Sequence, residues 1–137
     1  MSAIVHTLVL PAGRDAVWEA WTTAPGLARW LCRAARIDAV VGGAVHLEWD
    51  PAAPRPALTP TLDGEVLFLD RPRLLELRLG DAAGAAVTVA LAPSLDGTRL
   101  TLTQAGFSDD PGGESVRQRC DAAWVLALGR LRAALPR

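Results

Sequence analysis

The stretch Thr98-Arg99-Leu100-Thr101-Leu102-Thr103-Gln104, followed by Ala105-Gly106-Phe107, decides how this chain folds. Leucine alternates there with arginine and threonine, and a period of two is typical of a strand with one buried face. An acidic, glycine-rich loop comes next, and one long amphipathic helix then runs nearly to the C-terminus. This order predicts a sheet with a helix packed across it.

The last helix is predicted to begin near Asp110-Pro111, where an acidic cap precedes a proline in the first turn. A helix over residues 113–135 would span roughly 34 Å at ~1.5 Å per residue, enough to cross several strands. Its apolar positions recur at helical spacing and are Val116, Cys120, Ala123, Trp124, Ala127, Leu128, Leu131 and Leu135.

Upstream, the pattern predicts a strand, two short helices and a series of strands. Four prolines within residues 50–60 predict a stiff, exposed loop, and the other connections are short and rich in turn formers, which favours an antiparallel meander. The expected strands are residues 4–10, 37–41, 44–49, 62–69, 74–79, 85–91 and 98–104, and the expected short helices are residues 16–21 and 26–31.

Length and composition indicate one soluble domain over residues 1–137. Half of the residues are apolar and 21% are charged, as is ordinary for globular proteins. The formal net charge of -1 shows no basic excess, which argues against a nucleic-acid partner. The absence of any apolar run of 18 residues or signal peptide argues against a membrane span, so we expect a cytoplasmic protein.

The residue types with catalytic chemistry are sparse. All 14 basic residues are arginine and there is no tyrosine, which excludes lysine Schiff-base chemistry and tyrosine as an acid or base. Cys32 and Cys120 have no second cysteine nearby, so neither a zinc site nor a redox pair is predicted. We expect reduced core cysteines, no metal and no cofactor.

No catalytic group of residues stands out either. His6 and His46 have no acidic or cysteine neighbour at the spacing of a dyad or a metal site, and nucleophile and phosphate-loop motifs are missing. The acidic residues around Pro111-Gly112-Gly113 lack calcium-loop spacing and fit helix capping. We therefore name no catalytic residues, and an enzyme is the less favoured class.

Side chains alternate along each strand, and this alternation (the parity of a position) predicts one buried, dry face of the sheet and one solvent-exposed, wet face. Gln104 falls on the dry parity, where its amide would bond either a ligand or a partner within the protein. Trp30, Trp49 and Trp124 come from three elements that should face the same space, whereas Trp18 and Trp21 fit helix-to-sheet packing. The candidate ligand-binding residues are Trp30, Trp49, Phe68, Leu77, Leu102, Gln104, Phe107, Trp124 and Leu128.

A family resemblance runs along almost the whole chain. It begins with Ala16-Val17-Trp18-Glu19-Ala20-Trp21-Thr22-Thr23-Ala24-Pro25 and Leu27-Ala28-Arg29-Trp30, which resemble the opening of bacterial proteins similar to the Hsp90 ATPase activator. It continues in Gly42-Gly43, Gly64-Glu65-Val66-Leu67, Arg71-Pro72-Arg73-Leu74 and the stretch from Leu100 to Phe107. Leu31 stands where the family often has a second tryptophan, Gln104 stands where it often has histidine, and the proline-rich loop is longer than usual.

The resemblance implies an α+β, START-like helix-grip fold, in which a curved antiparallel sheet of about seven strands wraps the long C-terminal helix. It implies a binding protein for a hydrophobic or aromatic small molecule, held between sheet and helix by a monomer or a homodimer. The alternatives are a polyketide cyclase-like enzyme, which would need a base such as Glu65 or His46 inside the pocket, and an Hsp90-type chaperone cofactor. The last ranks lowest, because 137 residues leave no room for the activator's second domain.

Overall fold

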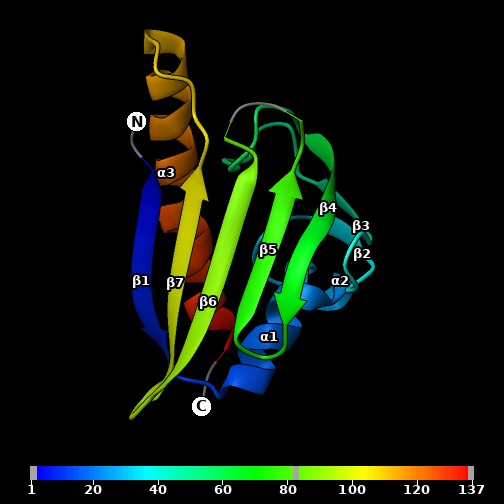
Figure 1. The fold of residues 1–137 in the computed structure, drawn as a ribbon, viewed down its shortest axis with the longest axis vertical. Coiled ribbons are helices and arrows are strands. Elements are labelled where there is room, and N and C mark those ends of the chain that lie inside the picture. The colour runs from blue at the N-terminus through cyan, green and yellow to red at the C-terminus, as the bar shows by residue number, and fades with distance from the viewer. Residues whose placement is uncertain (1–2, 82–83, 136–137) are drawn as a thin grey trace.

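The computed structural model describes residues 3–81 and 84–135 (Figure 1). Within these residues, seven strands and three helices follow one another. In order they are β1 (Ile4–Leu10), α1 (Arg14–Thr22), α2 (Ala24–Ala28), β2 (Ala34–Ile37), β3 (Ala44–Glu48), β4 (Thr61–Asp70), β5 (Leu74–Leu79), β6 (Ala86–Ser94), β7 (Gly97–Ala105) and α3 (Pro111–Ala134).

All seven strands form one antiparallel sheet in the order β1-β7-β6-β5-β4-β3-β2. The strands from β2 to β7 follow the predicted meander, and β1 closes the series by pairing with β7 along its whole length, from Ile4 opposite Gln104 to Leu10 opposite Thr98. In Figure 1 α3 lies behind β1 and β7, while α1 and α2 lie lower down behind β4 and β5. The expected fold is confirmed.

The core lies between the helices and one face of the sheet. Leu75, Leu77 and Leu79 of β5 are buried, and so are the alternating residues Val87, Val89 and Leu91 of β6. In β7 the buried parity ends in Gln104, which is 3% exposed. The strand parities were thus predicted correctly for these three strands.

Local capping explains where the helices begin. The Asp110 carboxylate accepts a hydrogen bond from the Gly113 amide at 2.7 Å, as expected for the start of α3. The second short helix begins at Ala24 rather than at the predicted residue 26, because the Thr23 hydroxyl caps the Gly26 amide at 3.0 Å and Pro25 fits the first turn.

The prediction of a strand at residues 37–41 is wrong, because β2 ends at Ile37. The Asp38 amide still donates to the Ala44 carbonyl, but the chain then turns, with the Gly43 amide bonded to the Val40 carbonyl. The β-branched pair Val40 and Val41 suggested a strand, yet these side chains are 53% and 64% exposed.

An irregularity in β4 overturns the placement of Phe68. The pairing with β5 shifts between Val66 and Phe68, so Val66 lies opposite Leu77 whereas Phe68 lies opposite Glu76. A bulge of this kind turns the following side chains to the other face of the sheet. Phe68 is therefore 43% exposed on the outer face, away from the space that it was expected to line.

No helix within the described ranges is both long enough and apolar enough to cross a bilayer.

Candidate ligand-binding cavity

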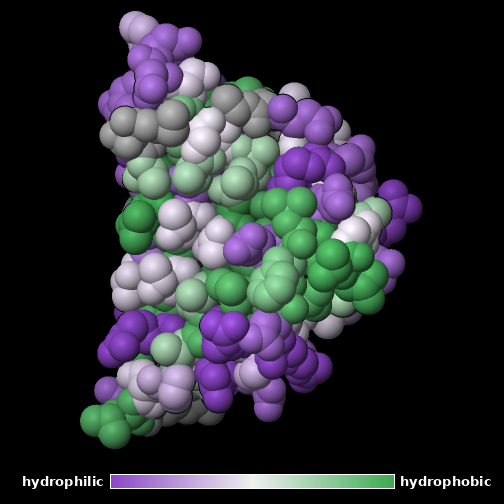
Figure 2. Space-filling model, in the orientation of Figure 1, coloured by the Kyte–Doolittle hydropathy of each residue, from purple (hydrophilic) through white to green (hydrophobic). Residues whose placement is uncertain are grey.

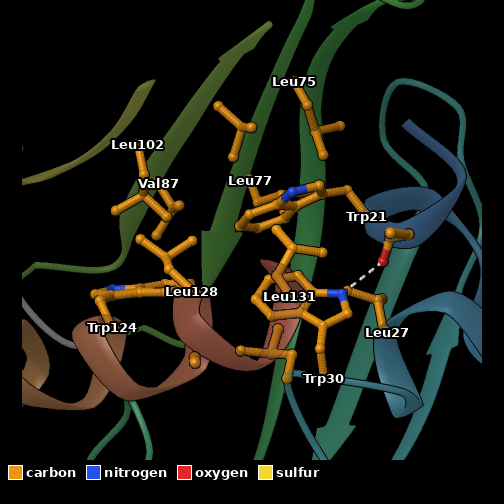
Figure 3. Packing of buried hydrophobic residues seen from close by; sticks show 14 of the residues in the cluster. Trp21, Leu27, Trp30, Leu75, Leu77, Val87, Leu102, Trp124, Leu128 and Leu131 are labelled. Atoms are coloured by element: carbon orange, nitrogen blue, oxygen red, sulfur yellow. Dashed lines mark hydrogen bonds between the residues drawn. The ribbon is translucent and has the colours of Figure 1, made fainter. Parts of the chain in front are cut away.

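Three tryptophans fill the middle of the space between the sheet and α3 (Figure 3). The rings of Trp21 and Trp124 stack with centroids 6.0 Å apart, and Trp21 meets Trp30 edge to face at 4.6 Å. Trp21 was expected only to pack α1 on the sheet, so its place at the centre of this group was not predicted. Leu77, Leu102, Trp124 and Leu128 are part of the same core and do not line the cavity described next.

The indole N–H groups are mostly bonded within the protein. Trp30 donates to the Ala20 carbonyl at 3.0 Å, Trp49 donates to the Leu31 carbonyl at 2.7 Å, and Trp124 donates to Gln104 Oε1 at 2.7 Å. The buried Trp21 Nε1 has no hydrogen-bond partner in the described part of the chain. The tryptophans therefore hold the elements together around the filled centre.

A cavity of about 240 Å³ lies at one end of this space, where the proline-rich loop faces the beginning of α3. Its base is formed by Gln104, Phe107 and Cys120, and mainly apolar side chains make up its wall. The other lining residues are Pro56, Ala57, Leu58, Thr59, Leu62, Leu79, Gly80, Asp81, Gly84, Ala85 and Val116. Of the candidate residues, Gln104 and Phe107 line this cavity, whereas Trp30 and Trp49 line a separate hollow of about 250 Å³.

Gln104 connects three parts of the fold at the base of the cavity. Its Nε2 donates to the Gly84 carbonyl, and its Oε1 accepts the Trp124 N–H. The amide therefore has partners within the protein, which is one of the two alternatives that the sequence left open. Gln104 joins the β5–β6 connection to α3 and keeps the base of the cavity in place.

Phe107 reaches the cavity because Gly84 lacks a side chain. Gly84 has a φ of +84°, and a Cβ at this position would lie 2.4 Å from the Phe107 ring. The Gly84 amide also donates to the Gly106 carbonyl at 3.0 Å. The turn and the aromatic wall thus depend on the same glycine.

Cys120 gives the cavity a neutral thiol. Burial raises the pKa of the Cys120 thiol, while the charge of Arg119 and a hydrogen bond with Gln104 act in the opposite direction. Burial likewise raises the pKa of Cys32 to about 11. Both thiols stay protonated at neutral pH and behave as small apolar groups with a weak donor.

Both histidines have acidic partners that sequence reasoning missed. His46 Nδ1 lies 2.8 Å from Asp63 Oδ1, and His46 Nε2 lies 3.0 Å from Glu48 Oε2. The hydrogen bond with Asp63, followed by that with Glu48, raises the pKa of His46. Glu48 was detectable, since it shares a strand face with His46 two residues away. Asp63 was not, because its position depends on the pairing of β3 with β4.

His6 on β1 meets α3 in the same way, with its Nε2 2.6 Å from Asp121 Oδ1. Within residues 3–81 and 84–135, no three His, Cys, Asp or Glu side chains gather closely enough to hold a metal ion.

A seven-stranded antiparallel sheet that clasps one long terminal helix, with a small apolar cavity at the end of the interface, defines a helix-grip domain. The family model for the activator of Hsp90 ATPase homolog 1-like protein matches residues 11–136. The chain therefore belongs to this family, as the sequence pattern predicted.

Solved structures of similar fold cover nearly the whole chain. A protein from Mesorhizobium loti is 20% identical with a TM-score of 0.81, and the match covers 98% of this chain and 96% of that one. A protein from Chromobacterium violaceum is 26% identical with a TM-score of 0.77, covering 100% and 99%. The Aha1 dimer from Colwellia psychrerythraea is 18% identical with a TM-score of 0.78, covering 98% and 96%. No protein of curated function matches this sequence.

Proposed function

We propose that this protein binds one small, uncharged, apolar or aromatic molecule in the cavity above Gln104, Phe107 and Cys120. The observation that carries the proposal is the cavity itself, of about 240 Å³ with mainly apolar walls. An apolar cavity of about 150 Å³ admits benzene, so this one suits a substituted single ring or a pair of fused rings. A long lipid chain would not fit, because the tryptophans fill the middle of the interface.

The positions of the ionisable groups favour binding over cyclase-like chemistry. Among the described lining residues the titratable groups are the neutral Cys120 and Asp81, whose side chain is 96% exposed and bonded to Arg78 at 2.8 Å. His46 and Glu65, which an enzyme of that class would need inside, have charged partners elsewhere: His46 bonds Asp63 and Glu48, and Glu65 lies 3.6 Å from Arg78. A chaperone-cofactor role ranks below both, since only the family description supports it.

The test is a titration with 4-nitrotoluene, a neutral aromatic quencher of tryptophan fluorescence. Trp124 bonds Gln104 at the base of the cavity, so occupancy should quench its emission in a saturable way. A ligand at ~100 times its Kd should also add ~2.7 kcal/mol to the free energy of unfolding, seen as a higher Tm.

Two variants locate the binding. Val116→Phe should abolish the quenching, because Val116 lines the cavity and a ring there would fill it. Val125→Phe is the matched control on the same helix, where the side chain is 58% exposed and lines none of the cavities described above. Absence of saturable quenching and of a Tm shift across neutral one-ring and two-ring compounds would refute the proposal, and so would unchanged binding by Val116→Phe.

The assembly is also a proposal: a monomer or a homodimer, in the cytoplasm. The similar Aha1 structure is a dimer. Leu67 and Phe68 of β4 are exposed, and so are Val40 and Val41 in the turn that bonds to β4 through Gly42 and Val66. Figure 2 shows apolar surface gathered over β4 and the neighbouring turn. Sedimentation velocity distinguishes the two states. A dimer formed through this apolar surface should be dissociated by Phe68→Ser and left intact by Leu95→Ser, at a fully exposed position elsewhere.

A further inference from the structure

A second cavity of about 360 Å³ lies between α3 and the proline-rich loop. The loop contributes Ala53, Pro54, Arg55 and Ala57, and the helix contributes Arg119, Ala122, Ala123 and Leu126. The helical positions are spaced by three, four and seven residues, so they form a single stripe along α3. Ala57 also borders the first cavity, so the two sites are neighbours along the proline-rich loop.

The loop wall is held in shape from within. The Arg55 guanidinium donates to the carbonyl oxygens of Pro51, Ala53 and Leu58 at 3.2, 3.4 and 3.3 Å, and its Nε is buried without a partner in the described part of the chain. Four prolines further limit the motion of the loop. The cavity is therefore present before any ligand arrives.

The charged side chains that line the second cavity are all positive. Arg55 and Arg119 are the ionisable groups among its described lining residues. The nearest acids on the helix are engaged elsewhere, since Glu114 bonds Arg117 at 2.7 Å and Asp121 bonds His6 at 2.6 Å. The positions three and four residues from Arg119 are Ser115, Val116, Ala122 and Ala123, so no carboxylate shares its face.

The separate hollow lined by Trp30 and Trp49 is also rich in positive charge. It shares Ala53 with the second cavity and is lined by Arg29, Arg33 and Arg130, with Asp50 as the acidic residue among its described lining. The two hollows together are lined by five arginines and one aspartate, and Glu48 lies 4.0 Å from one of these arginines, Arg33, although the chain as a whole carries a net charge of -1. A positive potential of this kind attracts anions.

The walls between the charges are apolar. Leu126 is 50% exposed in spite of its size, and alanines and Pro54 make up the rest of the lining. We infer that this cavity binds a small amphipathic carboxylic acid, with the carboxylate against Arg119 and the hydrocarbon against Leu126. Guanidinium groups bind carboxylates through two parallel hydrogen bonds, which suits an exposed arginine beside an apolar wall.

The experiment is an amide NMR titration with sodium hexanoate at 0.15 M salt. The uncharged hexanamide is the control ligand. Hexanoate should cause saturable shifts at residues 53–57 and 119–126, and hexanamide should bind at least about fivefold more weakly, because the charged hydrogen bonds are lost. Arg119→Gln should weaken hexanoate binding by about five- to tenfold. Arg132→Gln, which removes the same charge outside the cavity, should change it by less than about twofold.

A second pair of variants tests the apolar wall. Leu126→Ser should weaken hexanoate binding, whereas Val125→Ser, one residue away and 58% exposed, should not. The inference is overturned if hexanoate does not saturate, if hexanamide binds equally well, if Arg119→Gln has no effect or if an acidic peptide binds where hexanoate fails. Because this cavity is distinct from that at Gln104, failure of 4-nitrotoluene binding there would leave the inference intact.

Discussion

At the scale of single residues, hydrogen-bond partners decide what the polar side chains of the sheet can do. Gln104 satisfies Trp124 and the Gly84 carbonyl at once, and His46 lies between two carboxylates. Neither side chain is left with an unpaired polar atom that would demand a ligand. Their contributions are therefore best measured through stability and titration.

Replacing Gln104 should destabilise the fold. Gln104→Leu leaves the Trp124 N–H and the Gly84 carbonyl buried without partners, which should lower the free energy of unfolding by about 2 kcal/mol in urea denaturation. Gln118→Leu is the control, because Gln118 is exposed and bonds Glu114 at 3.2 Å on the surface of α3, so its effect should stay within about 0.5 kcal/mol. Adding Trp124→Phe to Gln104→Leu should cost less than the sum of the two changes, because the unpaired N–H is then absent. A Gln104→Leu variant as stable as the wild type would show that these bonds contribute nothing.

The titration of His46 should depend on Asp63. Since the folded-state pKa of His46 is raised above its ordinary value of 6.5, its contribution to stability is present below that pH and is lost as pH rises through the folded pKa. Proton NMR should give a folded pKa above 6.5, and Asp63→Asn should lower it, because the hydrogen bond with Asp63 is the largest cause of the shift. The unfolding free energy of His46→Gln should vary less with pH across that range. A His46 pKa that is the same in Asp63→Asn would contradict the arrangement.

At the scale of elements, turns and register place the site. The β4 bulge turns Phe68 outward, and the connection from β5 to β6 brings Gly84 under the Phe107 ring. Each is a local backbone feature with an effect on a distant side chain. Gly80 and Gly84 both lie in the β5–β6 connection. Comparing them separates the steric clash with Phe107 from the cost of a positive φ.

Gly84→Ala should cost more stability than Gly80→Ala. Both glycines have positive φ, +84° and +92°, so alanine should cost roughly 1–2 kcal/mol at either position. Only at Gly84 would the new Cβ meet the Phe107 ring, at 2.4 Å, which should add ~1–3 kcal/mol of overpacking. Urea denaturation of the two variants gives the difference directly, and equal costs would mean that the ring moves aside freely.

At the scale of the whole molecule, the helix-grip architecture has been filled in its middle and left open at its margins. The stack of Trp21 on Trp124 closes the centre, and the hollows lie where the proline-rich loop meets the sheet and α3. The loop borders both proposed sites. Its internal bonds should therefore influence both kinds of binding.

Arg55→Met should loosen the loop without unfolding the protein. The variant loses the donors to three loop carbonyls, so amide hydrogen exchange within residues 50–60 should speed up while exchange in β5 to β7 stays slow. Binding of both 4-nitrotoluene and hexanoate should weaken, because both sites share Ala57 as a wall. Arg99→Met, on β7 outside the loop, is the control. Unchanged exchange in the loop would show that the prolines alone keep it in place.

The sequence by itself determined the fold class, the bounds of β1 and β5, the cap of α3 at Asp110 and the buried parity that ends in Gln104. The fold class came from the family resemblance together with the order of the elements, and the other features are read from residues next to one another, through periodicity, capping and turn chemistry. Tertiary structure alone decided the outward turn of Phe68, the contact of Trp21 with Trp124, the pairing of His46 with Asp63 and the position of the cavity. Such features depend on strand register and on packing between residues far apart in the chain, where a shift of one residue sends a side chain to the opposite face.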